Sequence, residues 1–208
     1  MFAPGAGRPL GAVAVVLLLV AGLVALGEIP DRWAAVAALA LLTAVWAFLA
    51  WFFRDPERTP GEGVVSPADG RVRAVEREGD RWRISVFMNV TDVHVNRFPL
   101  DGRVETVGDA GHGHRPAYRP DADHNVQRSY RLSTPLGPVE VVQMTGILAR
   151  RLVSFVRPGR DGRKGDRLGM IILGSRVDVL LPADRVQPRV QVGDRVRAGE
   201  SSLAREAP

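Results

Sequence analysis

The sequence predicts a mostly β, barrel-sandwich-like domain preceded by an α-helical transmembrane hairpin. Two uncharged apolar runs lie near the N-terminus, and the composition shifts at the polar segment RDPERTPGEG, residues 54–63. The rest of the chain alternates short apolar segments with Gly, Pro and Asp, which is typical of short strands joined by tight turns. We therefore expect a membrane-anchoring hairpin over residues 1–53 and one β domain over residues 54–208.

The two apolar runs cover residues 10–27 and 33–53. A helix needs about 20 residues to cross a bilayer core, so each run is long enough. The joining segment EIPDR is short and contains Pro30, which predicts a tight helical hairpin. A cleaved signal peptide and a buried hairpin of a soluble protein are the alternatives, but the second apolar run favours a retained anchor.

The distribution of arginine predicts the orientation of this hairpin. Arg8 precedes it, and Arg54 and Arg58 follow it. Because positive residues flank the cytoplasmic ends of membrane helices, both termini are expected in the cytoplasm. The β domain is then expected at the cytoplasmic face of the cell membrane.

Composition narrows the partners and the chemistry. The chain has no cysteine, which excludes disulfides and thiolate metal ligands. The net charge of +5 and the isoelectric point near 10.8 suit an anionic partner. Aromatic residues make up only 6% and no basic block is interleaved with Tyr or Phe, so we expect a membrane surface and no nucleic acid.

The β domain is predicted from short apolar or alternating segments. They are residues 70–76, 81–90, 137–145, 169–182 and 189–200. Residues 145–156, TGILARRLVSFV, fit either a helical turn or a strand. A weak repeat, RKGDRLGMIIL and QVGDRVRAGES, resembles the paired hairpins of biotin- and lipoyl-carrier domains. Lys164 is the only lysine and lies in a glycine-rich turn, which counts against a carrier.

The segment IILGSRVDVLLP, residues 171–182, is predicted as one buried strand that contains Gly174, Ser175 and Arg176. Burying these groups is costly unless they are satisfied or used. The Ser175 hydroxyl can attack the Gly174 carbonyl, where glycine leaves the backbone free to bend. Elimination of the resulting ester leaves dehydroalanine, which hydrolyses to a pyruvoyl group. The alternative is an ordinary strand bulge.

Four segments in register carry a resemblance to a known family. They are VVSPADGRV (64–72), FMNVTDVHVNRFPLDG (87–102), TGILARRLVSFV (145–156) and GDRLGMIILGSRVDVLLP (165–182). Together they resemble the short, bacterial and archaeal type of phosphatidylserine decarboxylase. The resemblance implies a proenzyme that cleaves itself between Gly174 and Ser175.

The same resemblance implies the cofactor, the substrate and the assembly. The cofactor is a pyruvoyl group made from Ser175, which forms a Schiff base with phosphatidylserine and releases CO₂ to give phosphatidylethanolamine. Chains 1–174 and 175–208 are expected to form a heterodimer, and a higher oligomer is also compatible with the resemblance. A relative acting on an archaeal-type serine lipid is an alternative.

The resemblance also implies the site residues. Asp69 matches the family aspartate and is expected to promote self-cleavage, directly or through His94. His94 is expected to handle protons during decarboxylation. The longer members carry Gly-Ser-Thr where this chain has Gly-Ser-Arg, and a second histidine where this chain has Arg97. The identity of the self-cleavage base therefore stays open.

Each site residue also has an ordinary structural explanation. Asp69 is able to cap a turn, and His94 is able to sit satisfied in the core. Arg97 is either a ligand of a substrate phosphate or carboxylate, or a surface charge. Arg176 is expected to stabilise the oxyanion during cleavage or the lipid phosphate afterwards.

Two other functions are weighed against this one. One is a non-enzymatic membrane-anchored adaptor. The other is a membrane-tethered zinc hydrolase, in which His112 and His114 bind metal with His124 or Asp123. We expect these side chains to be solvated and the protein to hold no metal.

Overall fold

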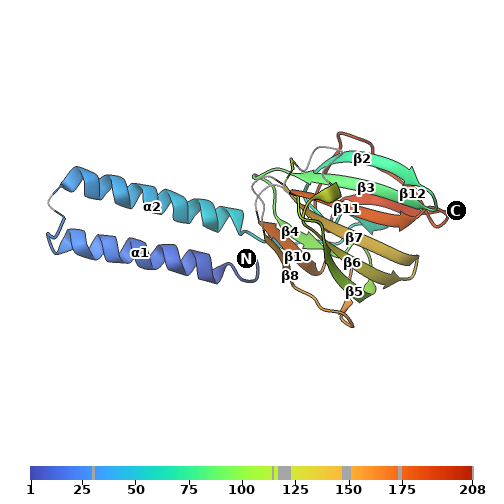
Figure 1. Cartoon of the computed structure of the whole chain (residues 1–208), viewed down its shortest axis with the longest axis horizontal. Helices are drawn as coiled ribbons and strands as arrows, with labels where there is room; N and C mark the ends of the chain where they lie inside the picture. The colour runs from blue at the N-terminus through green and yellow to red at the C-terminus, as the bar shows by residue number, and fades with distance from the viewer. Residues whose placement is uncertain (30, 114, 117–122, 147–150, 173–174, 208) are drawn as a thin grey trace. The chain divides into compact units, whose positions relative to one another are not determined.

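The computed structural model describes residues 1–207 except 30, 114, 117–122, 147–150 and 173–174. The chain divides into two compact units, Met1–Pro56 and Glu57–Pro208 (Figure 1). The division falls inside the polar segment at which the sequence composition shifts.

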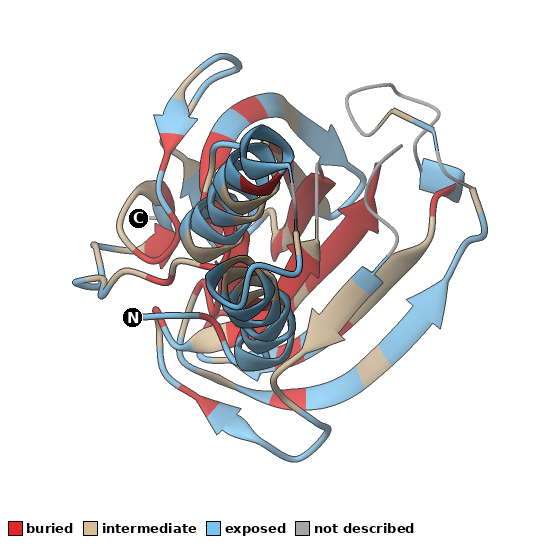
Figure 2. Ribbon diagram, turned by 90° about the vertical axis from the view of Figure 1, so that its left-hand side faces the viewer, coloured by how far each residue is buried: buried red, intermediate tan, exposed pale blue. Residues whose placement is uncertain are grey.

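The first unit is a pair of packed helices, α1 (Gly7–Ala25) and α2 (Arg32–Phe52). Asp31 caps α2, because its Oδ1 accepts the backbone N–H groups of Trp33 at 2.9 Å and Ala34 at 3.2 Å. Both helices are long and apolar enough to cross a membrane. Within the apolar 18-residue stretch of each helix, only 6% of the residues of α1 and 11% of those of α2 are buried. Figure 2 shows both helices mostly exposed, which favours an anchor over a core hairpin of a soluble protein.

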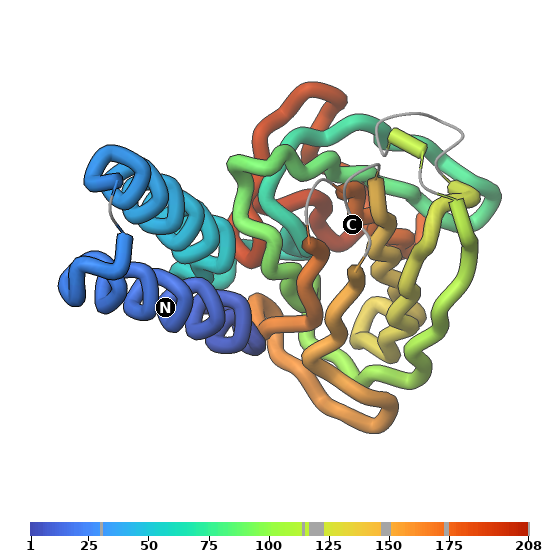
Figure 3. Tube along the Cα trace, turned by 60° about the vertical axis from the view of Figure 1, so that its left-hand side comes forward, coloured from blue at the N-terminus to red at the C-terminus, as the bar shows by residue number. Residues whose placement is uncertain are grey.

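The second unit is mostly β, as predicted. Its main sheet has the order β13-β2-β3-β11-β7-β6-β5-β9 and is antiparallel throughout. The strands are β2 (Gly70–Glu78), β3 (Arg81–Met88), β5 (Gly102–Ala110), β6 (Gln127–Thr134), β7 (Gly137–Thr145), β9 (Asp161–Gly162), β11 (Ser175–Pro182) and β13 (Arg195–Val196). The sheet curls around a core of Val, Ile and Leu side chains (Figure 3).

Two short sheets complete this unit. One has the order β4-β10-β8, with β4 (Val95–Arg97), β8 (Arg151–Ser154) and β10 (Arg167–Ile172). The other has the order β1-β14-β12, with β1 (Val64–Val65), β12 (Val186–Pro188) and β14 (Ser202–Glu206). Leu168 and Ile171 of β10 belong to the same apolar core as the main sheet, so the β4-β10-β8 sheet packs on the inner face of the curled sheet.

Alternation along β11 fixes the two faces of the main sheet. Val177, Val179 and Leu181 belong to the core, and Ser175 precedes them with the same period of two. Arg176 and Asp178 therefore lie on the outer face. Most residues of β11 and of its neighbour β7 are buried.

The repeated Gly-Asp motif forms the same turn twice. Asp166 N–H donates to the Arg163 carbonyl at 2.9 Å, and Asp194 N–H donates to the Gln191 carbonyl at 3.2 Å. The glycines between them have φ values of +85° and +100°, which a type II turn requires at its third position. The residues after the turns differ, since β10 is six residues long and β13 only two.

Candidate active site

Ser175 lies at the point where the chain changes sheets. β10 ends at Ile172 and pairs with β4 and β8, whereas β11 begins at Ser175 and pairs with β3 and β7. The prediction of one strand over residues 171–182 is therefore wrong. The end of β10 and the residues of β11 are both rich in apolar side chains. The sequence therefore shows a single apolar run and gives no sign that the chain passes from one sheet to another. Gly174 lies outside the described residues.

The Ser175 side chain is fully buried on the inner face of the main sheet. Its backbone pairs with Met88 of β3 and Thr145 of β7. Its Oγ lies 3.4 Å from the Met88 Sδ, and the residue is 0% exposed. Sulfur is a weak acceptor, so this contact orients the hydroxyl without holding its proton strongly.

His94 lies beside the end of β10. Its carbonyl accepts the Ile171 N–H at 3.2 Å, and its ring is completely buried. The ring Nδ1 is 2.9 Å from the Asp92 carbonyl oxygen. In a neutral imidazole this makes Nδ1 the donor, so Nε2 carries the lone pair that accepts a proton.

Asp69 sits in the turn before β2 and is 9% exposed. Its Oδ2 lies 2.9 Å from the Arg58 Nη2, and its Oδ1 accepts the Ala198 N–H at 2.7 Å. Burial raises the pKa of the Asp69 carboxyl, the Ala198 amide and Arg58 oppose that rise, and the nearby charge of Asp92 adds to it. Asp69 is therefore a stronger proton acceptor than an ordinary aspartate.

The sheet register relates Asp69 to Ser175. Arg71 of β2 and Arg176 of β11 both pair with Phe87 of β3, so β2 and β11 run in the same direction on either side of β3. Asp69 is two residues before Arg71, and Ser175 is one residue before Arg176. Two strand spacings, together roughly 10 Å, lie between them. This backbone spacing favours a proton path from Ser175 to Asp69 through His94 over a direct one.

Arg97 and Arg176, the two arginines expected to bind the substrate or the oxyanion, are both buried. Arg97 is 7% exposed and donates from Nη1 to the Gly165 carbonyl at 2.8 Å, so the surface-charge alternative for Arg97 is wrong. Arg176 donates to Asp178 from Nε at 2.8 Å and from Nη2 at 2.7 Å, and it also binds Asp123. Its charge is thus balanced on the face opposite Ser175.

A cavity of about 360 Å³ opens on the inner side of the curled sheet, the side on which the Ser175 side chain lies. Its lining is Asp109, Ala110, Gly111, Val126, Arg128, Arg151 and Leu152. The Val126 carbonyl accepts the Thr145 N–H at 3.0 Å, and Thr145 in turn pairs with Ser175. Strand β7, which contains Thr145, therefore lies between Ser175 and the cavity wall at Val126.

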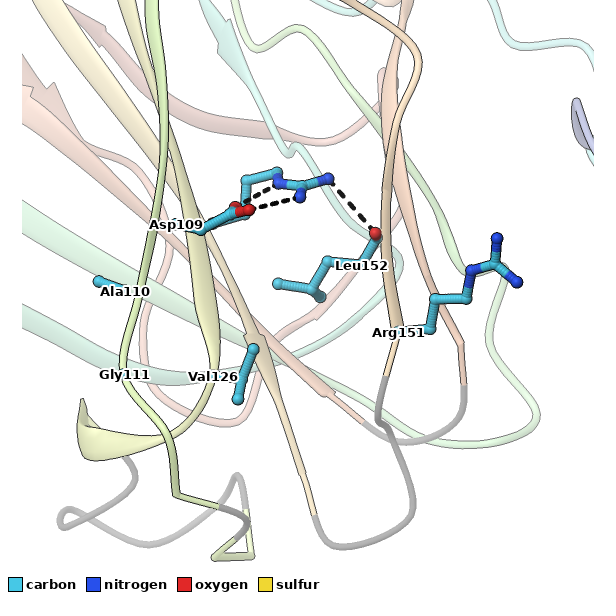
Figure 4. Close-up of a pocket in the computed structure, with 7 residues that line it drawn as sticks. Asp109, Ala110, Gly111, Val126, Arg151 and Leu152 are labelled. Carbon is cyan, nitrogen blue, oxygen red and sulfur yellow. Dashed lines mark hydrogen bonds and ion pairs between the residues drawn. The ribbon is translucent and has the colours of Figure 1, made fainter.

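An arginine bridges this cavity. Arg128 donates to both carboxylate oxygens of Asp109, from Nε at 2.5 Å and from Nη2 at 2.7 Å, and from Nη1 to the Leu152 carbonyl at 3.3 Å. Figure 4 shows Asp109 and Leu152 on opposite sides of the cavity, and the Arg151 side chain pointing away from it. The cavity combines apolar walls with one paired cation.

Several polar groups of this region were not predicted from the sequence. Arg58, interpreted only as a topology signal, is the ion-pair partner of Asp69. Asn96 and Gln143 are fully buried and bonded to each other. Alternation along residues 137–145 puts Gln143 on the apolar face with Val139 and Val141, and this was the available signal.

The histidine-rich loop offers no alternative metal centre within the described residues. His114 lies outside them, and His112 and His124 meet through backbone atoms, since the His112 N–H donates to the His124 carbonyl at 3.1 Å. Among the residues that the structure describes, no group of three or more His, Cys, Asp or Glu side chains could hold a metal ion.

Comparison with known proteins decides the family. The model of a family described as phosphatidylserine decarboxylase matches residues 45–204. The chain belongs to the phosphatidylserine decarboxylase family. Membership in this family supports a decarboxylase function.

Three relatives indicate the range of the family near this chain. A protein of Halobacterium salinarum, provisionally named an archaetidylserine decarboxylase proenzyme, is 48% identical over 78% of this chain and 83% of its own length. Phosphatidylserine decarboxylase proenzymes of Thermobifida fusca and Streptomyces griseus are 44% and 41% identical, over 79% and 84% of this chain. The alignments cover 76% and 81% of those two proteins.

Proposed function

We propose that the chain is a proenzyme that cleaves itself between Gly174 and Ser175 and then decarboxylates phosphatidylserine to phosphatidylethanolamine. The observation that carries the proposal is Ser175, a fully buried hydroxyl at the change between two sheets, bound to a weak sulfur acceptor. A hydroxyl with a purely structural role would be expected to bind a stronger acceptor.

Self-cleavage balances with one water molecule. The Ser175 Oγ attacks the Gly174 carbonyl carbon, its proton passes to a base, and the C–N bond breaks to give an ester and a free amine. Loss of the Ser175 Cα proton then expels the Gly174 carboxylate and leaves dehydroalanine. Water hydrolyses the imine tautomer of this residue, which releases ammonia and leaves a pyruvoyl group on the chain 175–208.

The fully buried position of Ser175 fits this cofactor, because exclusion of water protects a reactive ester and strengthens local electrostatics. A pyruvoyl group supplies a carbonyl that takes up the substrate amine and accepts the electron pair left by CO₂. The protein residues around it have to bind the headgroup, exclude water and move protons.

We assign proton transfer during self-cleavage to Asp69 acting through His94. Burial raises the pKa of Asp69, and the spacing of roughly 10 Å between β2 and β11 favours an intermediate carrier. The His94 backbone lies next to the end of β10, and with Nδ1 facing the Asp92 carbonyl its Nε2 is the ring nitrogen proposed to carry the proton. In the mature enzyme, His94 is proposed to return a proton to the decarboxylated carbon.

The cavity beside Thr145 is the proposed entry for the lipid headgroup. It lies on the same face as Ser175, and its walls combine Leu152 and Val126 with the Arg128 guanidinium. In the sequence, Arg58, the ion-pair partner of Asp69, follows the last residue of α2 by six positions. The cavity lining supports a lipid headgroup as substrate, whereas the cytoplasmic location of the β domain is proposed from the arginine distribution alone.

The two chains formed by cleavage are expected to stay together. The chain 175–208 contains β11, which is hydrogen-bonded to β3 and β7 in the middle of the main sheet. It also contains β13 and β14, which pair with β2 and β1 of the larger chain. Separation would break all of these ladders, so a heterodimer is the proposed mature form.

Reaction with a carbonyl reagent tests the proposal. The purified protein is treated with hydroxylamine or borohydride, and CO₂ release from phosphatidylserine vesicles is measured before and after. We expect the smaller chain to be labelled and the activity to disappear in proportion. Full activity after complete labelling, or no reactive carbonyl, would contradict the proposal.

The similarity to the Halobacterium protein supports one alternative substrate. Phosphatidylserine and archaetidylserine share the serine headgroup and differ in the glycerol backbone and its chains. The same CO₂ assay with vesicles of each lipid separates these two substrates. The adaptor and zinc-hydrolase alternatives predict no CO₂ release from either lipid.

A further inference from the structure

A row of fully buried side chains connects Tyr130 to Ser175 across the interior. The Tyr130 hydroxyl donates to the Gln143 Oε1 at 3.0 Å, and the Gln143 Nε2 donates to the Asn96 Oδ1 at 2.7 Å. The Asn96 Nδ2 lies 3.6 Å from the Met88 Sδ, the same sulfur that the Ser175 hydroxyl contacts at 3.4 Å. All five residues are 0% exposed. We call Tyr130, Gln143, Asn96 and Met88 the buried relay.

All hydrogen bonds within the buried relay are donated in the same direction, from Tyr130 towards Met88. The Gln143 Oε1 only accepts, so the Tyr130 hydroxyl has to donate, and this orients the Gln143 amide. The Gln143 Nε2 then faces the Asn96 Oδ1, which turns the Asn96 Nδ2 toward the Met88 sulfur. Burial raises the pKa of the Tyr130 phenol, which keeps this first donor protonated at neutral pH.

The relay joins the two sheets, and a glycine makes room for it. Tyr130 and Gln143 belong to the main sheet, whereas Asn96 belongs to β4 and pairs with Gly169 of β10. A Cβ on Gly169 would lie 2.8 Å from the Tyr130 hydroxyl and 2.9 Å from the Gln143 Nε2. Both distances are too short, so the absence of a side chain at residue 169 preserves the relay.

We propose that Asn96, Gln143 and Tyr130 are positioning residues for self-cleavage, and that they act on Ser175 through the Met88 sulfur. The inference rests on the proposed self-cleavage and adds residues to it. A methionine side chain has three rotatable bonds and adapts easily, so its sulfur needs an external donor to stay in one place. The Asn96 amide supplies this donor.

The Met88 sulfur has the properties that the step needs. It holds the Ser175 hydroxyl in one rotamer on the inner face. As a weak acceptor it gives the hydroxyl up easily when a base takes the proton. Misplacing a reacting group by about 1 Å can slow a reaction a hundredfold, so a loose Met88 is expected to slow cleavage.

The test is a double-mutant cycle on self-cleavage of the full chain. Met88→Leu conserves volume and removes the sulfur, and Asn96→Leu removes the donor. Each variant is synthesised in a cell-free system with membranes, and conversion of the intact chain is followed on denaturing gels. We expect each single change to slow cleavage by about tenfold to a hundredfold. The matched control, Met170→Leu, changes a buried methionine of β10 outside the relay and should cleave at the wild-type rate.

The double variant separates positioning from a general structural effect. If Asn96 acts through Met88, the double variant cleaves no more slowly than the slower single variant. Independent structural damage would multiply the two effects, which would overturn the inference. Wild-type rates in both single variants would also overturn it.

Two further measurements keep the test decisive. Thermal unfolding in the Ser175→Ala background checks that each uncut variant is folded. If Asn96→Leu does not fold, Tyr130→Phe replaces it, since it removes a single hydroxyl and is expected to slow cleavage about fivefold, as loss of one hydrogen bond would. An unchanged rate in Tyr130→Phe would then contradict the inference. An uncut wild-type chain would instead contradict the proposed function itself.

Discussion

Replacing Asp69 by asparagine should stop self-cleavage while the protein stays folded. Asparagine keeps the size of the side chain and an oxygen for the Ala198 N–H, which now binds at 2.7 Å. It removes the negative charge and the proton acceptor. Loss of a general base typically slows a step by about a hundredfold to ten-thousandfold, so the intact chain should accumulate.

The structure limits the cost to stability. Arg58 donates to Asp69 at 2.9 and 3.2 Å, and hydrogen bonds to charged groups contribute about 1.5–3 kcal/mol. Arg58 keeps Glu200 as a partner at 3.1 Å. Because the folded pKa of Asp69 is raised, ionising it costs folding free energy at neutral pH, and asparagine removes that cost. The net loss should stay below about 3 kcal/mol, within the 5–15 kcal/mol that is usual for domains.

Glu200→Gln is the matched control for this experiment. It removes the other carboxylate that binds Arg58, at a similar distance, but leaves Asp69 in place. Cleavage is followed by pulse-labelling and denaturing gels, and folding by thermal unfolding. We expect Glu200→Gln to cleave at close to the wild-type rate. Equal slowing in both variants, or normal cleavage in Asp69→Asn, would refute the assignment of Asp69 as the base.

Three other outcomes are expected. Wild-type cleavage should slow as the pH falls through the pKa of Asp69, which burial raises above 3.8, because the base works only when ionised; a rate that stays constant from neutral pH down to pH 3.8 would contradict this. His94→Ala should slow cleavage by about a hundredfold to ten-thousandfold, as Asp69→Asn does, because Asp69 is proposed to act through His94, and the fraction that does cleave should release CO₂ more slowly than the wild type; normal cleavage and turnover would remove His94 from the site. Reporter fusions at both ends of the chain should lie in the cytoplasm, and an external C-terminus would refute the hairpin topology.

The strand content was largely predictable, and the missed strands have a physical reason. Residues 137–145 show alternation and form the buried strand β7, and the apolar run 169–182 contains parts of two buried strands, the end of β10 and the whole of β11. Strands β5 and β6 were not predicted, because their outer faces are polar and their inner residues, such as Val104 and Leu132, are widely spaced. Residues 189–200 alternate like a strand but are mostly turns, since Gly193 and Gly199 adopt φ values of +100° and +78°.

The residues of the candidate site could be proposed from the sequence, but their geometry could not. Ser175, Asp69 and His94 are all buried, which a linear motif suggests but does not demonstrate. The ion pair between Arg176 and Asp178 was not predicted from the Gly-Ser-Arg motif. The two side chains lie on the same face of β11 only when residues 175–182 form a strand. The buried relay joins residues as far apart as Asn96 and Gln143, so only the packing of two sheets reveals it.

The intact mass of the purified full-length protein tests the central claim most directly. We predict two chains that end at Gly174 and begin at residue 175, with the smaller lighter by one ammonia than residues 175–208 with a free serine N-terminus. Ser175→Ala should give one uncut, inactive chain. A single uncut wild-type chain, or a Ser175→Ala protein that releases CO₂ at the wild-type rate, would contradict the account.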